Sequence, residues 1–124
     1  MKISEKTYGK VSVLSLSGKI KGGPEVGDIH TAIKSTLEKS IEYIVVDLKE
    51  VDWMGSVGVG ILICCLTTVR NAGGYLKLSG LSKKVKKILE ITKLDNVFDV
   101  YPDVEQAVAG FELQTSFLNI GKIP

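Results

Sequence analysis

The chain has 124 residues, of which 44% are hydrophobic and 24% charged, and its formal net charge is +2. This length predicts one globular domain, and so small a net charge gives no support for nucleic-acid binding. The start of the chain lacks the apolar core of a signal peptide, and the longest uncharged apolar run, 57–66, is too short to span a membrane. We therefore expect a cytoplasmic protein that contacts neither membrane nor nucleic acid.

Two strands and a glycine-rich loop are predicted at the start of the chain. Residues 3–7 and 11–16 have strand-like patterns and are separated by a turn at 8–10, which predicts a β-hairpin. A loop rich in glycine follows at 18–27. Asp28 is then placed to cap an amphipathic helix whose apolar residues recur every four positions.

Strands and helices alternate in the rest of the chain. The run 43–48 is apolar throughout, which indicates a central parallel strand buried on both faces. A helix over 57–71 is apolar on all sides at its start, so we expect that half to be buried. The remaining predicted elements are a strand at 75–78, a helix capped by Ser82, a strand at 96–100 and a helix starting at Pro102. The order β-β-α-β-α-β-α-β-α predicts parallel middle strands and an antiparallel N-terminal edge.

Residues capable of catalysis or metal binding are not grouped in the sequence. His30, the only histidine, is far along the chain from Ser56, so that serine has no evident general base. Cys64 and Cys65 are adjacent within an apolar helix, and we interpret them as small buried hydrophobes. The sequence therefore predicts no metal, no cofactor and no enzymatic activity.

Three glycines follow the apolar strand and open the central helix. Their spacing, G-x-x-G-x-G over 55–60, is the reverse of the dinucleotide-binding fingerprint G-x-G-x-x-G. We instead expect Gly58 and Gly60 to let the helix pack closely on the sheet.

Lysines 83, 84, 86 and 87 form a basic face on the predicted third helix. No aromatic residues are interleaved with them, so a solvated surface is the preferred interpretation. Weak contact with an acidic protein or a phosphate surface is the alternative.

Ser56 is predicted to stand at the start of the central helix, where two compatible roles are open to it. As an N-cap, its hydroxyl would accept a hydrogen bond from a free backbone N–H of the first turn. As a phosphoacceptor, it would place a dianion where those N–H groups and the helix dipole stabilise it. The fold would change little, but an apolar, glycine-rich surface would gain charge, which would switch the binding of a partner.

The sequence around Ser56 also matches a known motif. An apolar strand ends in Asp47-Leu48, and Val51-Asp-Trp-Met-Gly-Ser-Val-Gly-Val-Gly60 follows. This pattern resembles the STAS family motif V-x-x-[hydrophobic]-D-S-S-G-[LV]-G, and within that family the bacterial anti-sigma factor antagonists. Segments 70–78 and 85–98 are similar to later passages of the family. The resemblance covers about 4–111, so we expect a STAS domain over 1–111 and a C-terminal tail of unknown role over 112–124.

The resemblance carries expectations of fold and function. It implies a small mixed sheet with helices mainly on one face. It also implies an antagonist that binds an anti-sigma factor with serine-kinase activity and thereby frees a sigma factor. The kinase phosphorylates the first serine of the motif, which Ser56 matches; this ends the interaction, and a serine phosphatase reverses it. The expected partner-binding residues are Lys21, Gly22, Gly23, Gly55, Ser56, Val57, Gly58, Val59 and Leu62, with the exposed side of the helix near Leu62 and Cys65.

Differences from the family motif leave an alternative open. The motif's aspartate is Gly55 here, its second serine is Val57, and Lys21 stands about where a loop residue is commonly acidic. These differences favour a STAS scaffold or subunit of a signalling or lipid-transport complex that works without a phosphate cycle. A scaffold should co-purify in a stable large assembly, whereas a switch should exchange partners in the presence of ATP.

Overall fold

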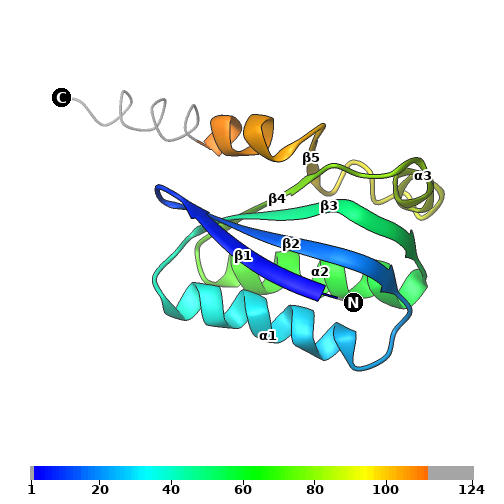
Figure 1. Ribbon diagram of the computed structural model, residues 1–124, viewed down its shortest axis with the longest axis horizontal. Helices are drawn as coiled ribbons and strands as arrows, with labels where there is room; N and C mark the ends of the chain where they lie inside the picture. The colour runs from blue at the N-terminus through cyan, green and yellow to red at the C-terminus, as the bar shows by residue number, and fades with distance from the viewer. Residues whose placement is uncertain (1, 112–124) are drawn as a thin grey trace.

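The computed structural model describes residues 2–111 and shows a twisted five-stranded sheet with helices packed against it (Figure 1). Its elements are β1 (Lys2–Tyr8), β2 (Val11–Ile20), α1 (Glu25–Glu38), β3 (Tyr43–Met54), α2 (Ser56–Asn71), β4 (Tyr75–Ser79), α3 (Lys83–Ile91) and β5 (Asp99–Tyr101), followed by a helical segment at 104–111. This order confirms the predicted alternation of strands and helices.

The strands lie side by side in the order β1-β2-β3-β4-β5. β1 pairs antiparallel with β2, whereas β2, β3, β4 and β5 are mutually parallel. β3 occupies the centre, and its run Ile44, Val45, Val46 and Leu48 is at most 1% exposed. The predicted antiparallel edge and the predicted burial of the central strand on both faces are therefore confirmed.

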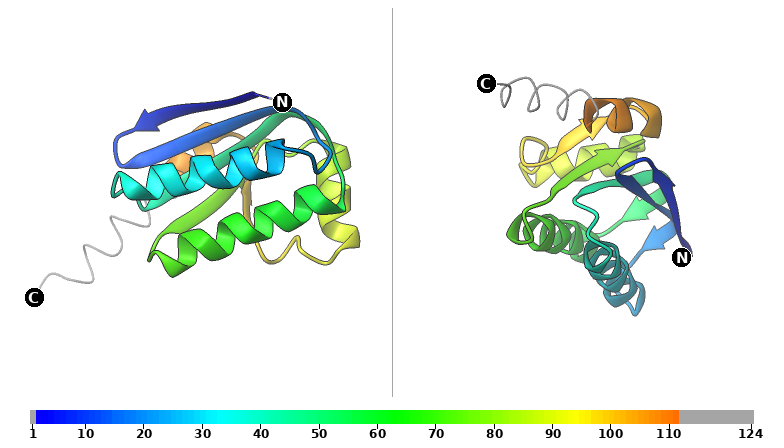
Figure 2. Two further views of the ribbon diagram at one scale, coloured as in Figure 1. Left: turned by 90° about the horizontal axis from the view of Figure 1, so that it is seen from below. Right: turned by 90° about the vertical axis from the view of Figure 1, so that its left-hand side faces the viewer.

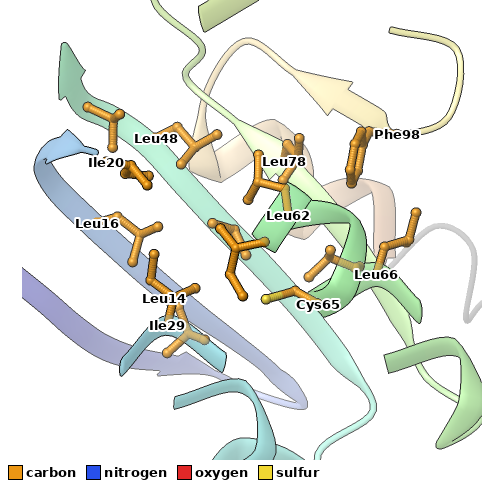
Figure 3. Close-up of a cluster of buried hydrophobic side chains, with 14 of the residues drawn as sticks. Leu14, Leu16, Ile20, Ile29, Leu48, Leu62, Cys65, Leu66, Leu78 and Phe98 are labelled. Carbon is orange, nitrogen blue, oxygen red and sulfur yellow. The ribbon is translucent and has the colours of Figure 1, made fainter. Parts of the chain in front are cut away.

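The helices form two layers around the sheet. α1 and α2 cover one face, and the segment 104–111 lies over the other (Figure 2). Because side chains alternate along a strand, neighbouring residues of β3 serve different cores: Val46 belongs to the large core under α1 and α2, and Val45 to the smaller one under 104–111. Figure 3 shows part of the large core, to which β2, β3, β4, α1 and α2 all contribute.

Several element boundaries differ from the prediction. β2 continues to Ile20 and β3 continues to Met54, because both of these side chains are buried in the core. α1 begins at Glu25 with Pro24 at its N-cap position, so the prediction that Asp28 caps this helix is wrong. The connections that follow β2 and β3 are consequently short: only 21–24 separate β2 from α1, and only Gly55 separates β3 from α2.

Two further expectations concern membranes and the tail. Within residues 2–111, no helix is both long enough and apolar enough to cross a bilayer. The predicted tail at 112–124 lies outside the described residues.

Candidate partner-binding site

Ser56 is the first residue of α2, and its side chain is exposed. The N-cap position is occupied by Gly55, whose backbone is extended and which has no side chain to accept a hydrogen bond. The prediction that Ser56 caps the helix is therefore wrong, because the cap lies one residue earlier. Ser56 is thus an exposed residue of the first helical turn.

The end of β2 holds the start of α2 in place. The backbone N–H of Gly55 donates to the carbonyl oxygen of Ile20 over 3.2 Å, and Val59 N–H donates to the Gly55 carbonyl over 3.1 Å. The N–H groups that precede Val59 in the helix have no intrahelical acceptor, as in every α-helix. α2 also has no acidic residue in its first turn, so no carboxylate of that turn offsets the positive end of the helix dipole.

The loop between β2 and α1 is closed by one carboxylate. Glu25 Oε1 accepts hydrogen bonds from the backbone N–H groups of Lys21, Gly22 and Gly23 over 2.9, 3.0 and 3.1 Å. The pKa of Glu25 is lowered to about 2 because its carboxylate accepts hydrogen bonds from backbone amides. The largest effect comes from the amide of Glu25 itself, followed by those of Gly23 and Lys21. The loop 21–23 is thus wrapped around an ionised side chain at neutral pH.

This loop lies against the start of α2. A Cβ built on Gly22 would stand 3.0 Å from the Cβ of Val57, and Val57 is itself 52% exposed. The contact brings together residues that are far apart in the sequence. We call them the Ser56 surface: the exposed residues Lys21, Gly22, Gly23, Ser56 and Val57, together with the half-buried Gly55.

Three of the predicted partner-binding residues lie beneath this surface instead of on it. Gly58, Val59 and Leu62 are buried, and Leu62 and Cys65 are both 0% exposed. Figure 3 shows these last two side chains within the core. The expectation that they mark the exposed side of α2 is therefore wrong: this side of the helix faces the sheet.

Close packing of α2 on the sheet depends on one of the two predicted glycines. A Cβ on Gly58 would lie 2.5 Å from Met54 Cγ and 2.8 Å from Ile20 Cγ2, whereas a Cβ on Gly60 would meet nothing within 4 Å. The prediction is confirmed for Gly58 and wrong for Gly60.

Trp53 is a surface residue that the sequence analysis did not single out. Its indole is 44% exposed, and its Cη2 atom lies 2.9 Å from where a Cβ of Gly55 would stand. The signal in the sequence was a lone tryptophan two residues before Gly55. Beside it runs a groove of about 240 Å³ lined by Trp53, Met54, Lys84, Lys87, Ile88 and Ile91.

His30, the one histidine of the sequence, lies far from Ser56 in this arrangement. His30 Nε2 is 3.0 Å from Thr68 Oγ1, a contact that joins α1 to the later part of α2. Thr68 is twelve residues beyond Ser56 in one helix, which is about 18 Å at 1.5 Å per residue. Within 2–111, no three histidine, cysteine or acidic side chains are grouped so as to hold a metal ion.

The two cysteines have different environments. Cys65 is fully buried, as predicted, and burial raises the pKa of its thiol to about 12, with a smaller contribution from Cys64. Cys64 is exposed, so the prediction that both cysteines are buried holds for one only.

Comparison with known proteins places these features in context. A family model for the STAS domain matches residues 2–107. The anti-sigma-B factor antagonist of Bacillus subtilis is 34% identical over 61 residues, which are 49% of this chain and 56% of that protein. The chain matches 64% of the length of two antagonists from Thermotoga. It therefore spans less than two thirds of each of these curated relatives.

Solved structures share the same fold. An anti-sigma factor antagonist from Mycobacterium paratuberculosis has a TM-score of 0.77 at 26% identity, over 88% of this chain and 92% of that one. SpoIIAA, a Bacillus cell fate determinant solved in its phosphorylated form, has a TM-score of 0.68 at 17% identity, over 89% of this chain and 99% of that one. The second likeness concerns the fold alone.

Proposed function

The chain belongs to the STAS domain family, and from this premise we propose that it is an anti-sigma factor antagonist whose partner binding is switched at Ser56. The observation that carries the proposal is the position of Ser56, exposed at the first residue of α2 and flanked by the loop 21–23. Relatives that share the fold are themselves named anti-sigma factor antagonists.

The helix start suits a phosphorylated serine. A phosphate adds about −1.5 to −2 charges and three acceptor oxygens. At Ser56 these oxygens would stand beside the free N–H groups of α2, at the positive end of a helix whose first turn contains no acidic residue. Because Ser56 is exposed, phosphorylation requires no rearrangement of the core. The modification would change the charge of the surface and leave the fold intact.

The Ser56 surface supports partner binding by its composition. Its exposed centre consists of Val57, Ser56 and glycine backbone, and the charged groups beside that centre are Lys21 and the carboxylate of Glu25 held by the loop 21–23. The Glu25 carboxylate is already paired with three backbone N–H groups, so another protein can cover the centre of this surface with little desolvation of unpaired charge. A dianion at its centre would have to be desolvated in the same complex, which opposes binding.

The partners follow from this function. An anti-sigma factor with serine-kinase activity would bind the unmodified surface, release its sigma factor and phosphorylate Ser56. A serine phosphatase would restore the unmodified form. In this scheme the chain is a non-enzymatic regulator of transcription that acts in the cytoplasm.

A scaffold without a phosphate cycle is the second candidate, and the environment of Gly55 favours it. The family motif has an aspartate at this position, but here the indole of Trp53 occupies the space that its Cβ would need. A kinase that recognises that carboxylate would not find it in this chain. The scaffold would present the same surface in a permanent complex.

Substitution of Ser56 separates these two functions. We expect Ser56→Ala to bind the purified anti-sigma factor kinase as the unmodified chain does, and Ser56→Asp to bind at least about tenfold more weakly, a difference of about 1.4 kcal/mol. Ser35→Asp is the matched control, because Ser35 is exposed on α1, away from the Ser56 surface. Equal binding by all three variants would contradict the switch and favour the scaffold.

A further inference from the structure

A groove that adjoins the Ser56 surface combines exposed apolar side chains with positive charge. We call it the Trp53 groove; its lining residues are Trp53, Met54, Lys84, Lys87, Ile88 and Ile91. Ile91 is 66% exposed and Trp53 is 44% exposed, and the two lie together in one groove. These residues come from the end of β3 and from one face of α3.

The charge of the groove comes from α3. Its nine residues include four lysines, and Glu90 is its only acid. Because residues three and four apart share a helix face, Lys84 and Lys87 lie together on the groove side with Ile88 and Ile91, whereas Val85 and Leu89 are buried in the core. Neither groove lysine has an ion-pair partner within 4.0 Å among the described residues.

The groove is continuous with the Ser56 surface through Trp53. The indole lies against Gly55, the residue that immediately precedes Ser56. A protein bound over Ser56 would therefore reach the indole and, beyond it, Lys84 and Lys87. The two surfaces can be parts of one interface.

We propose that the Trp53 groove binds an acidic, amphipathic segment of the partner anti-sigma factor. This inference rests on the proposed function and specifies the chemistry of the partner. Apolar side chains of the segment would pack on Trp53 and Ile91, and its carboxylates would pair with Lys84 and Lys87. A phosphate on Ser56 would stand beside the same indole and repel the incoming carboxylates, so the charge of the partner segment explains the direction of the switch.

A lipid surface fits this region less well than a protein segment. Membrane-surface helices expose one long apolar face to the bilayer, but the main apolar face of α3, with Val85 and Leu89, is already buried against the sheet. The exposed apolar groups come from both β3 and α3, and together they line a groove. This geometry favours an inserted peptide over a flat lipid surface.

Charge reversal on the two sides of α3 tests the inference. The double variant Lys84→Glu/Lys87→Glu reverses the charge on the groove side of α3. The control variant Lys83→Glu/Lys86→Glu makes the same change in net charge, but on lysines that do not line the groove. We expect the groove variant to bind the anti-sigma factor roughly tenfold more weakly than the control variant, with a smaller salt dependence. Thermal unfolding of both variants checks that they remain folded.

The outcomes distinguish this inference from the proposed function. If the unmodified chain binds the anti-sigma factor and both variants bind equally well, the groove inference is overturned and the proposed function stands. If the unmodified chain binds none of the anti-sigma factors of its organism, the proposed function fails. In that case a second experiment, which needs no anti-sigma factor, tests whether the groove binds an acidic segment.

The second experiment uses Trp53 as the reporter, because it is the only tryptophan in the chain. The probe is a synthetic amphipathic peptide with leucines on one face and glutamates on the other, added to the full chain. We expect it to shift Trp53 fluorescence, and we expect no shift from the same peptide with lysines in place of glutamates. Phosphatidylserine vesicles are added in a parallel titration. If the acidic peptide causes no shift in Trp53 fluorescence, or if the vesicles alone cause one, the inference is wrong.

Discussion

Gly22 lies directly against Val57, so the loop after β2 and the start of α2 form one surface. Gly22 has a φ of 100°, a conformation that disfavours every residue with a Cβ. We predict that Gly22→Ala destabilises the chain by about 1 kcal/mol and displaces the loop from Val57. Binding of the anti-sigma factor should weaken as a result.

Gly9→Ala is the control for this substitution. Gly9 also has a positive φ, of 60°, but a Cβ there would meet nothing within 4 Å. Gly9→Ala should therefore cause a comparable loss in the free energy of unfolding, measured with urea, and leave binding of the anti-sigma factor unchanged. Equal loss of binding in both variants would show that stability, and not the position of the loop, determines affinity.

A single added methyl group should change the free energy of unfolding in opposite directions at Gly58 and at Gly60. Gly58→Ala forces the new Cβ into Met54 and Ile20, and we predict a loss of about 1–3 kcal/mol in the free energy of unfolding. Gly60→Ala meets no neighbour, and we predict a gain of about 0.5–1 kcal/mol from the higher helix propensity of alanine. Urea unfolding of the two variants provides the measurement, and similar effects in both would refute the packing argument.

The carboxylate of Glu25 should make the stability of the chain depend on pH in the acid range. Its pKa falls from the usual value of 4.5 in the unfolded chain to about 2 in the folded chain. A group with a depressed folded pKa contributes stability above its unfolded pKa and loses that contribution as the pH falls. The contribution of Glu25 should therefore be complete above pH 4.5 and disappear as the pH approaches about 2.

Glu25→Gln provides the comparison for this titration. The free energy of unfolding of Glu25→Gln should be lower than that of the original chain above pH 4.5, and the two should converge near pH 2. Carbon-13 NMR of the Glu25 carboxyl group gives a direct test. A midpoint near 4.5 would show that the loop 21–23 does not hold the carboxylate in solution.

Lys77 is buried on the sheet face that carries the segment 104–111. It is 4% exposed, its Nζ lies 2.9 Å from Tyr101 Oη and 3.4 Å from Asp99 Oδ2, and it stands 4.7 Å from the ring centroid of Phe111. Tyr101→Phe removes the short hydrogen bond from a buried ammonium group. We predict a loss of about 1–3 kcal/mol in the free energy of unfolding.

A double-mutant cycle tests this assignment. In a Lys77→Met background there is no buried ammonium, so Tyr101→Phe should then cost close to nothing. An undiminished cost in that background would mean that Tyr101 stabilises the chain by another contact.

The order of the elements could be predicted from hydrophobic periodicity, but the ends of β2 and β3 could not. Lys49 and Glu50 interrupt the apolar pattern of β3 and suggest a turn. Nevertheless the strand continues through Glu50, which pairs with Ser17 of β2. Pairing with a neighbouring strand depends on residues distant in the sequence, so no local pattern reveals it.

The sequence correctly placed Ser56 at the start of the central helix, but the local roles of the residues around it depended on geometry. A helix that is apolar on all sides gives no unique inward face, and this is why Leu62 was expected at the surface. The cap at Gly55 follows from its extended backbone. The roles of Trp53 and Glu25 arise from contacts with Gly55 and with the loop 21–23, which become visible only in three dimensions.

The central claim, that Ser56 is a phosphorylated switch, is tested most directly by phosphosite mapping. The chain would be isolated from its own cells in growth and under stress, and the peptide containing Ser56 would be quantified by mass spectrometry in both forms. The account predicts phosphate on Ser56 at a level that changes with condition. Full coverage of that peptide with no phosphate in any condition would contradict the switch.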